Sequence, residues 1–418
     1  MKVMLLIVVF LFVGCSSAPK YKYESQIKSS ELDIFMQGKP IAYRPWFDVY
    51  LRQGQRNSVL NEMRIGLLAF QNQEYDLAAW LFDRAIVKIE TIFANNKTAK
   101  KARSKFTSEE VKDFKGDPYE RAMVYFYRGL IYLIRDDYEN ARASMLGGLL
   151  QDSLAEDQEY EQDFSSHFYL AAWASHCNGN QSQMEDYYNQ AIKYKPYLPK
   201  PQPGDNILIV ATSGISPIKK RQGKYNEQRY FDSYADLASY QMSRPELQIG
   251  TLKIPFFISD NLHWQATTRG GRAIDIINKG KAVFKENSGK AGDSFVQTGN
   301  TLMTQGRYSN NKKLGNAGAA FALIGLVSKG ISKATTPTAD IRYWDNLPSQ
   351  IYLGKSSKSQ INDSSFSFNF IDRVSQESND YSLKFGQKVK NELQPNSSCD
   401  LIFMTNKSNY LTFRHINQ

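Results

Sequence analysis

Apolar residues recur at three- and four-residue spacing between about Asn57 and Lys195, which is the spacing of one face of an α-helix. Three weak copies of one pattern lie within this region, with small residues where two antiparallel helices would meet. The recurring positions are Gly66, Tyr75, Ala78, Phe82 and Ala85 in the first copy, Gly129, Tyr132, Tyr138 and Ala141 in the second, and Ala191 and Pro196 in the third. The pattern predicts a helical repeat region over 57–198. A helical bundle without a repeat superhelix is the alternative.

The second copy carries the clearest signals for the start of a helix. In the stretch GDPYERAMVYFYRGLIYL, Asp117 is suited to cap the helix, Pro118 to its first position, and Glu120 to the capping box. The spacings of the three copies resemble those of the tetratricopeptide repeat. This resemblance implies a scaffold without reactive groups that binds peptide or protein segments on a concave face.

The pattern changes after a segment with four prolines, KPYLPKPQPGD, which predicts a stiff linker over 199–205. The apolar run at 206–214 predicts a buried strand. Further strands are predicted at 247–257, 349–355, 365–370, 399–406 and 410–415, and helices at 269–286 and 315–332. We therefore expect a multi-domain protein, with the all-α region followed by an α+β domain over 206–418 that has a mostly antiparallel sheet and helices on one face.

The first residues form an apolar run that ends at Gly14-Cys15-Ser16. The run is too short to span a membrane and has the parts of a secretory signal peptide over 1–14. Phe12 to Cys15 resembles the bacterial lipobox, which implies that Cys15 is lipidated and becomes the first mature residue. Ser16 then implies outer-membrane sorting in a diderm bacterium, with 15–56 as tether and lead-in. An ordinary signal peptide with a coincidental cysteine is the alternative.

A resemblance to a known family enters with three segments. GDPYERAMVYFYRGLIYLIRDDYENARAS (116–144), NILIVATSGISPIKK (206–220) and ADIRYWDNLPSQIYLG (339–354) resemble an uncharacterised family of bacterial lipoproteins with tetratricopeptide-like repeats. The similarity spans roughly residues 55 to 355. It implies architecture and an envelope location, and it assigns no catalytic residues.

Charge is distributed unevenly along the chain. Residues 1–198 carry 24 Lys and Arg against 25 Asp and Glu, whereas residues 199–418 carry 28 against 17. For an envelope protein, the counter-charge of such a basic region is an anionic envelope polymer, a lipid headgroup or an acidic protein face rather than nucleic acid. A merely soluble basic surface is the alternative.

Two segments offer residues that commonly contact partners. Asp340, Arg342 and Trp344 lie in ADIRYWDNLP, and Lys219, Lys220 and Arg221 lie in a predicted basic loop after the first strand. As structure, the first segment would be a turn with the tryptophan in the core, and the second a solvated loop. The Gly/Ala-rich stretch 317–327 predicts either a core helix or a contact between subunits.

The chemistry-bearing residues form no catalytic or metal-binding motif. The four histidines show no zinc spacing, Ser213 lacks the surroundings of a nucleophile, and His263 stands alone, so no metal, cofactor or catalysis is predicted. Cys177 and Cys399 either pair or remain free thiols. We expect a lipid-anchored envelope module that holds a protein partner. An enzyme acting on peptidoglycan or a related polymer and a structural subunit of an oligomeric envelope complex are the alternatives.

Overall fold

The structure is a computed structural model. It describes residues 27–94, 113–153, 163–232, 243–249, 252–267, 338–360, 366–372, 378–380 and 399–406, with single residues between 290 and 322. The leader with Cys15, the predicted helix at 269–286 and the predicted strand at 410–415 lie outside the described residues. The same holds for the stretch 317–327, apart from Ala322.

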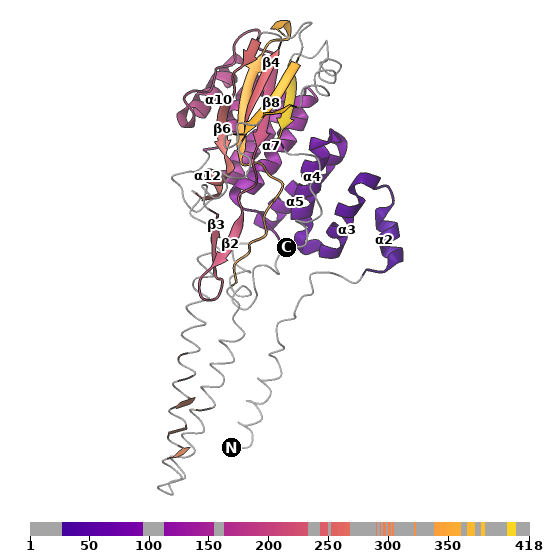
Figure 1. Cartoon of the computed structure of the whole chain (residues 1–418), viewed down its shortest axis with the longest axis vertical. Coiled ribbons are helices and arrows are strands. Elements are labelled where there is room, and N and C mark those ends of the chain that lie inside the picture. Colours follow the sequence, from indigo (N-terminus) through magenta and orange to yellow (C-terminus); the bar gives the residue numbers. More distant parts are fainter. Residues whose placement is uncertain are drawn as a thin grey trace.

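Helices occupy the described chain up to Tyr194. They are α2 (Ser29–Met36), α3 (Arg44–Gln53), α4 (Ser58–Gln71), α5 (Tyr75–Ala94), α7 (Pro118–Ile134), α8 (Tyr138–Ser153), α9 (Ser165–Cys177) and α10 (Gln181–Tyr194), with 3₁₀ turns at Ile41–Tyr43 and Gln55–Asn57. The last six helices form three pairs, α4 with α5, α7 with α8 and α9 with α10, and each pair packs against the next. Figure 1 shows α2 and α3 at the outer side of this array, away from the strands.

Local sequence explains where these helices begin and how closely they approach. Helix α7 begins at Pro118 as predicted, and the Asp117 N–H donates to Glu120 Oε2 at 2.6 Å in a capping box. Gly66 on α4 faces the Phe82 ring on α5, and a Cβ atom on Gly66 would lie 2.8 Å from Phe82 Cε1. Small residues therefore permit the close helix contacts at this predicted position.

Strands follow the helices along the chain. Sheet order is β10-β1-β7-β6 in the first four-stranded sheet and β5-β4-β8-β9 in the second, and β2 and β3 form a separate hairpin. The first sheet contains β1 (Ile207–Ser213), β6 (Phe257–Asn261), β7 (Gln350–Ser356) and β10 (Asp400–Thr405); the second contains β4 (Ser243–Ile249), β5 (Leu252–Ile254), β8 (Phe366–Asp372) and β9 (Ser378–Asp380); the hairpin contains β2 (Lys219–Gln222) and β3 (Gln228–Phe231). A short helix, α12 (Leu262–Thr267), follows β6, and a 3₁₀ turn at Lys358–Gln360 follows β7. Figure 1 shows the hairpin extending away from the two sheets.

Four predicted strands are confirmed, whereas β2, β3 and β9 were not predicted. The confirmed runs are 206–214, 349–355, 365–370 and 399–406, which contain β1, β7, β8 and β10 within one or two residues. The run at 206–214 is β1, which is buried on both faces as a continuous apolar strand requires. The run at 247–257, predicted as one strand, contains the end of β4, all of β5 and the first residue of β6. These strands belong to two different four-stranded sheets, whereas the sequence predicts one sheet. The first sheet is also mixed, because β1 pairs parallel with β10 and antiparallel with β7.

The two faces of β1 belong to different cores. Ile207, Ile209 and Ala211 pack with residues of the second sheet, including Leu247 and Phe370. Leu208 and Val210 belong instead to the core that contains the helices. The first sheet therefore lies between the helices on one face and the second sheet on the other.

Helices α4, α7 and α9, the first helices of the three pairs, are buried almost throughout. Ring contacts join them to the first sheet: Phe70 on α4 lies 4.8 Å from Phe403 on β10, and Tyr127 on α7 lies 6.3 Å from the same ring, between centroids. Helices α5, α8 and α10, the second helices, keep exposed positions. The order of layers is thus second helices, first helices, first sheet and second sheet.

Two further links join helices to the first sheet. The N–H groups of Ser165 and Ser166, at the start of α9, donate to the Asp260 carboxylate on β6 at 3.2 and 2.7 Å. Cys177, the last residue of α9, forms a disulfide with Cys399, next to β10, with a Cα–Cα distance of 5.8 Å. The Pro-rich segment 199–205 therefore connects two regions that share one hydrophobic core.

Candidate functional site

The two segments predicted to contact a partner come together at the N-terminus of α7. Lys219 Nζ donates to the carbonyl oxygen of Arg342 at 3.1 Å, and Arg221 Nε donates to that of Ala339 at 2.9 Å. Segment 338–348 therefore lies against strand β2. Sequence alone gives no sign of this contact, because more than a hundred residues separate the two segments.

Four charged side chains form a buried ionic cluster at this place: Asp117, Glu120, Lys219 and Arg229. Lys219 Nζ lies 2.8 Å from Glu120 Oε2 and 3.0 Å from Asp117 Oδ2, and Arg229 donates to Asp117 at 2.6 Å. At most 5% of any of the four side chains is exposed. Two carboxylates and two cations balance one another, so the cluster buries no net charge and fixes the β2–β3 hairpin to α7.

The cluster also orders its surroundings. The N–H of Trp344 donates to Glu120 Oε1 at 2.7 Å, which places the tryptophan ring beside Phe82 and Tyr127 in the core. Burial, with the nearby carboxylates of Glu120 and Asp117, holds the pKa of Tyr119 well above its usual value. Tyr119 therefore stays neutral within this closed site.

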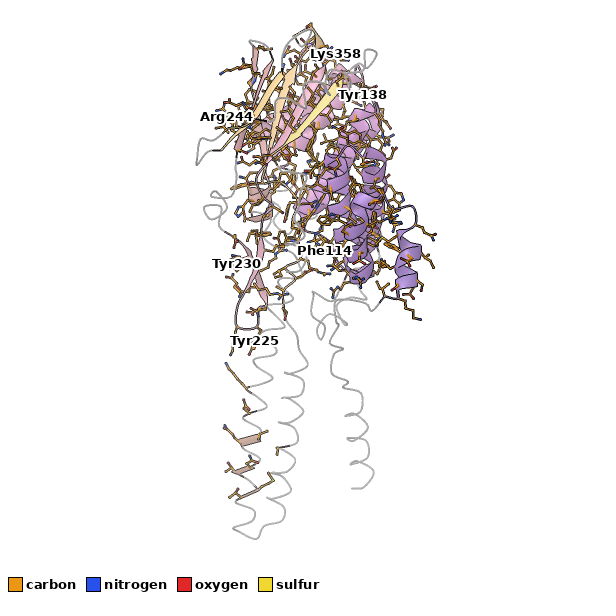
Figure 2. The ribbon with its side chains drawn as sticks, turned by 45° about the vertical axis from the view of Figure 1, so that its right-hand side comes forward. Phe114, Tyr138, Tyr225, Tyr230, Arg244 and Lys358 are labelled. Carbon is orange, nitrogen blue, oxygen red and sulfur yellow. A yellow bond between two sulfur atoms is a disulfide. The ribbon has the colours of Figure 1, made fainter. Side chains whose placement is uncertain are left out.

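Arg342 and Asp340 form a second set of contacts that holds segment 338–348 against the helices. The Arg342 guanidinium is paired with the Asp340 carboxylate at 2.8 Å and donates to Asn57 Oδ1 at 2.7 Å, over the ring of Phe114. Figure 2 shows Phe114 at the helical side of the molecule, toward the hairpin that carries Tyr230. These contacts attach segment 338–348 to the chain just before α4.

The placement of these residues decides which of them a partner can reach. Trp344, Asp340 and Lys219 are buried, and their contacts lie within the chain, as the structural alternative for segment 339–348 requires. The expectation of a solvated basic loop is wrong for Lys219, because the residue belongs to strand β2 and its ammonium group pairs with two buried carboxylates. Lys220, on the opposite face of the strand, is 51% exposed and pairs with Asp232.

Ser213 and His263 are both buried. Ser213 is the last residue of β1, and His263 Nε2 contacts the carbonyl oxygen of Asp232. Neither residue lines the pocket that is described next. Their positions give no reason to assign a nucleophile or a base to either.

A pocket opens at the other side of the first sheet, with a volume of about 290 Å³. We call it the aromatic pocket, and its lining residues are Tyr197, Arg244, Phe256, Phe257, Ile258 and Tyr352. They come from the chain after α10, from β4, from β6 and the residue before it, and from β7. Figure 2 shows Arg244 at the outer side of the strands, away from the helices.

Internal contacts hold the walls of the aromatic pocket in place. The Tyr197 ring stacks on Phe257 with centroids 6.5 Å apart, and its hydroxyl donates to the carbonyl oxygen of Ile258 at 2.9 Å. Partial burial, with the Asp260 carboxylate as a second cause, raises the pKa of Tyr197, so this hydroxyl remains a donor at neutral pH. The Tyr352 hydroxyl bonds to Gln350.

Sequence reasoning missed the aromatic pocket. Tyr197 falls at the end of the predicted helical region 57–198, just before the predicted linker, and the two phenylalanines fall in a predicted strand. The adjacent aromatic residues Phe256 and Phe257 are the only local signal. Because successive side chains of a strand point to opposite faces, the two rings cannot both pack on the same face of the sheet. The pocket itself depends on the packing of four separate segments.

A second accessible surface lies on the helices. Trp80 and Val87 on α5 are 46% and 61% exposed, and the Arg84 guanidinium lies 4.8 Å from the centroid of the Trp80 ring. We call these three residues the α5 face. Large apolar side chains also remain exposed at Leu150 on α8 and Tyr194 on α10.

Other classes of site are not found in the part of the chain that the structure describes. No group of three His, Cys, Asp or Glu residues there could hold a metal ion. No helix among those residues has the length and apolar content needed to cross a membrane. Comparison of the chain with protein-family models, curated proteins and solved structures finds no match.

Proposed function

We propose that this chain is a lipid-anchored module of a bacterial cell envelope that holds a protein partner on a tetratricopeptide-like helical region. The observation that carries the proposal is the layer order. The first sheet covers the first helices, so the outward sides of the second helices are the helical surface left for a partner. The partner surface is therefore the outer side of the helix pairs, in place of the inner side used by an open repeat scaffold.

The α5 face has the composition of a protein-binding surface. Tryptophan and arginine are the residue types that most often dominate binding energy, and here Arg84 lies over an exposed Trp80 ring. Arg84 also donates to the buried carboxylate of Glu62 at 2.9 Å, which fixes the guanidinium in place. A preorganised Trp–Arg pair loses little side-chain freedom on binding.

Two observations support an envelope location. Cys177 and Cys399 form a disulfide, a bond that is typical of proteins in oxidising compartments. The lipobox-like sequence that ends at Cys15 supports membrane attachment through acyl chains. The positive charge of residues 199–418 favours an anionic envelope polymer as a further contact.

Site-specific crosslinking in intact cells tests the partner surface. A photoreactive residue at Val87 is expected to yield a discrete crosslinked product, whereas the same residue at the exposed Lys253 on β5 is not. Trp80→Ala should remove most of the product formed at position 87. Equal products from both positions, or none from position 87, contradict binding on the α5 face.

The anchor is tested separately by labelling with palmitate. The wild-type protein is expected to incorporate the label and to stay with membranes, and Cys15→Ser should lose both properties. Label retained by Cys15→Ser would overturn the anchor while leaving the partner surface untouched.

A further inference from the structure

We propose that the aromatic pocket binds the C-terminal residue of a peptide chain, with its apolar side chain between the aromatic walls and its carboxylate on Arg244. The α5 face belongs to another layer of the molecule, so the two sites can fail independently. Three features of the aromatic pocket carry the inference.

The first feature is a cation that has no partner among the described residues. Arg244 is exposed, and no hydrogen bond or ion pair joins its side chain to another residue in the described part of the chain. The guanidinium groups of Arg64, Arg128, Arg229 and Arg342, by contrast, each pair with a carboxylate. A guanidinium presents two parallel donors that match a carboxylate, so the ligand contributes that group.

The backbone around Arg244 is held firmly. Arg244 lies opposite Ile371 in the ladder between β4 and β8, and the preceding Ser243 accepts a hydrogen bond from Asn406 Nδ2 at 2.7 Å. Pro245 follows, and its ring fixes the backbone dihedral φ. The base of the arginine side chain is therefore positioned before a ligand arrives.

The second feature is the apolar interior. Five of the six lining residues are aromatic or aliphatic. The stacked pair of Tyr197 and Phe257 forms one wall that is fixed by the hydrogen bond to Ile258. A volume of about 290 Å³ is at the lower limit for small-molecule sites and is sufficient for one amino-acid side chain.

The third feature is an open strand edge beside the pocket. Strand β6 is the last strand of the first sheet, and Phe257 and Ile258 belong both to this edge and to the pocket wall. The main chain of a peptide can pair with such an edge. The Tyr197 hydroxyl already donates to the Ile258 carbonyl oxygen, so the tyrosine side chain lies against this strand and disfavours further pairing past this point. A chain that ends here fits better than one that passes through.

The experiment uses the full-length protein in detergent and dye-labelled hexapeptides of sequence Gly-Ser-Gly-Ser-Leu-Phe. Fluorescence anisotropy is expected to show binding of the peptide with a free carboxylate and binding about 10- to 100-fold weaker for the C-terminal amide, as the loss of a charge-assisted hydrogen bond predicts. Arg244→Gln should weaken binding of the free carboxylate to the level of the amide, and Arg244→Lys should restore part of it. Lys253→Gln, an exposed cation on the neighbouring strand, serves as the control that changes nothing.

The remaining outcomes separate the alternatives. Phe257→Ala should weaken both peptides, with an unchanged circular dichroism spectrum as evidence of folding. Equal binding of acid and amide, no effect of Arg244→Gln, or no binding of either peptide overturns the proposal. N-acetylphenylalanine that competes as well as the hexapeptide identifies a site for small acids and overturns the assignment to a peptide chain.

Discussion

Lys219 on β2 and Glu120 on α7 form an ion pair of 2.8 Å in which neither side chain is more than 1% exposed. The two residues are 99 positions apart in the chain, and each has a second partner within the site: Lys219 pairs with Asp117, and Glu120 accepts the N–H of Trp344. One buried pair thus holds the hairpin, the start of a helix and segment 338–348 together. Breaking such a pair leaves a buried charge without compensation.

Lys219→Met is therefore expected to destabilise the protein by about 3–5 kcal/mol, because two buried carboxylates would then share the single cation of Arg229. Lys220→Met supplies the matched control. The Lys220 side chain is 51% exposed, and its pair with Asp232 is worth less than about 1 kcal/mol. Urea unfolding of both variants measures the difference, and equal losses would show that the cluster does not hold the hairpin.

The disulfide between Cys177 and Cys399 closes a loop of 222 residues. A link across so long a loop restricts the unfolded chain strongly, so reduction is expected to lower the free energy of unfolding by about 2–5 kcal/mol. Urea unfolding with and without reductant measures the loss. Cys177→Ser with Cys399→Ser should match the reduced wild-type protein and should not respond to reductant. A reductant effect that persists in the double variant would rule out this disulfide as its cause.

The contact of Gly66 with Phe82 predicts an unusual response to alanine. Alanine normally stabilises a helix by about 1 kcal/mol relative to glycine. At position 66 its Cβ would lie 2.8 Å from a ring that is fully buried, and overpacking costs about 1–3 kcal/mol. Gly66→Ala should thus destabilise the protein.

A double-mutant cycle separates this clash from other effects of the alanine. Phe82→Leu removes the ring edge, so Gly66→Ala should cost less in that background than in the wild-type protein. Thermal or urea unfolding of the four proteins gives the coupling. Stabilisation by Gly66→Ala alone would contradict the close approach of α4 and α5.

Elements with a local cause could be predicted from the sequence. Strand β1 is an unbroken apolar run because both of its faces are buried, and α7 begins at Pro118 because Asp117 and Glu120 cap it. The parallel pairing of β1 with β10 has no such cause, since about 190 residues separate the strands and no turn fixes their register. The second sheet was missed for the same reason.

The sequence of the first helices shows that they are buried on more than one side, but it does not show which element covers them. Apolar residues lie on more than one side of α7, including Val124, Phe126 and Leu130, which is the pattern of a helix covered on both sides. That pattern does not say what covers it. The prediction for Lys219 is wrong for a different reason: a basic segment is usually solvated, whereas here the ammonium group pairs with buried carboxylates.

The raised pKa of Asp260 predicts how the free energy of unfolding depends on pH. Burial raises the pKa of its carboxyl to about 7, although hydrogen bonds from Ser166 act in the opposite direction. The pKa of an unfolded aspartate is about 3.9, so between this value and 7 the folded chain holds a proton that the unfolded chain has lost. This contribution to stability is complete below about pH 4 and is lost as the pH rises through 7, with a slope of about −1.4 kcal/mol per pH unit.

Asp260→Asn isolates this contribution, because the amide does not titrate. The free energy of unfolding of the wild-type protein minus that of Asp260→Asn is expected to fall by roughly 4 kcal/mol between pH 4 and pH 7 and to stay level on either side. The buried His167, whose pKa burial lowers to about 4, titrates in both proteins and cancels in the difference. A difference that instead rises with pH would mean that the N–H groups of Ser165 and Ser166 stabilise the charged carboxylate by more than burial opposes it. The start of α9 would then be an anion site that Asp260 fills from β6.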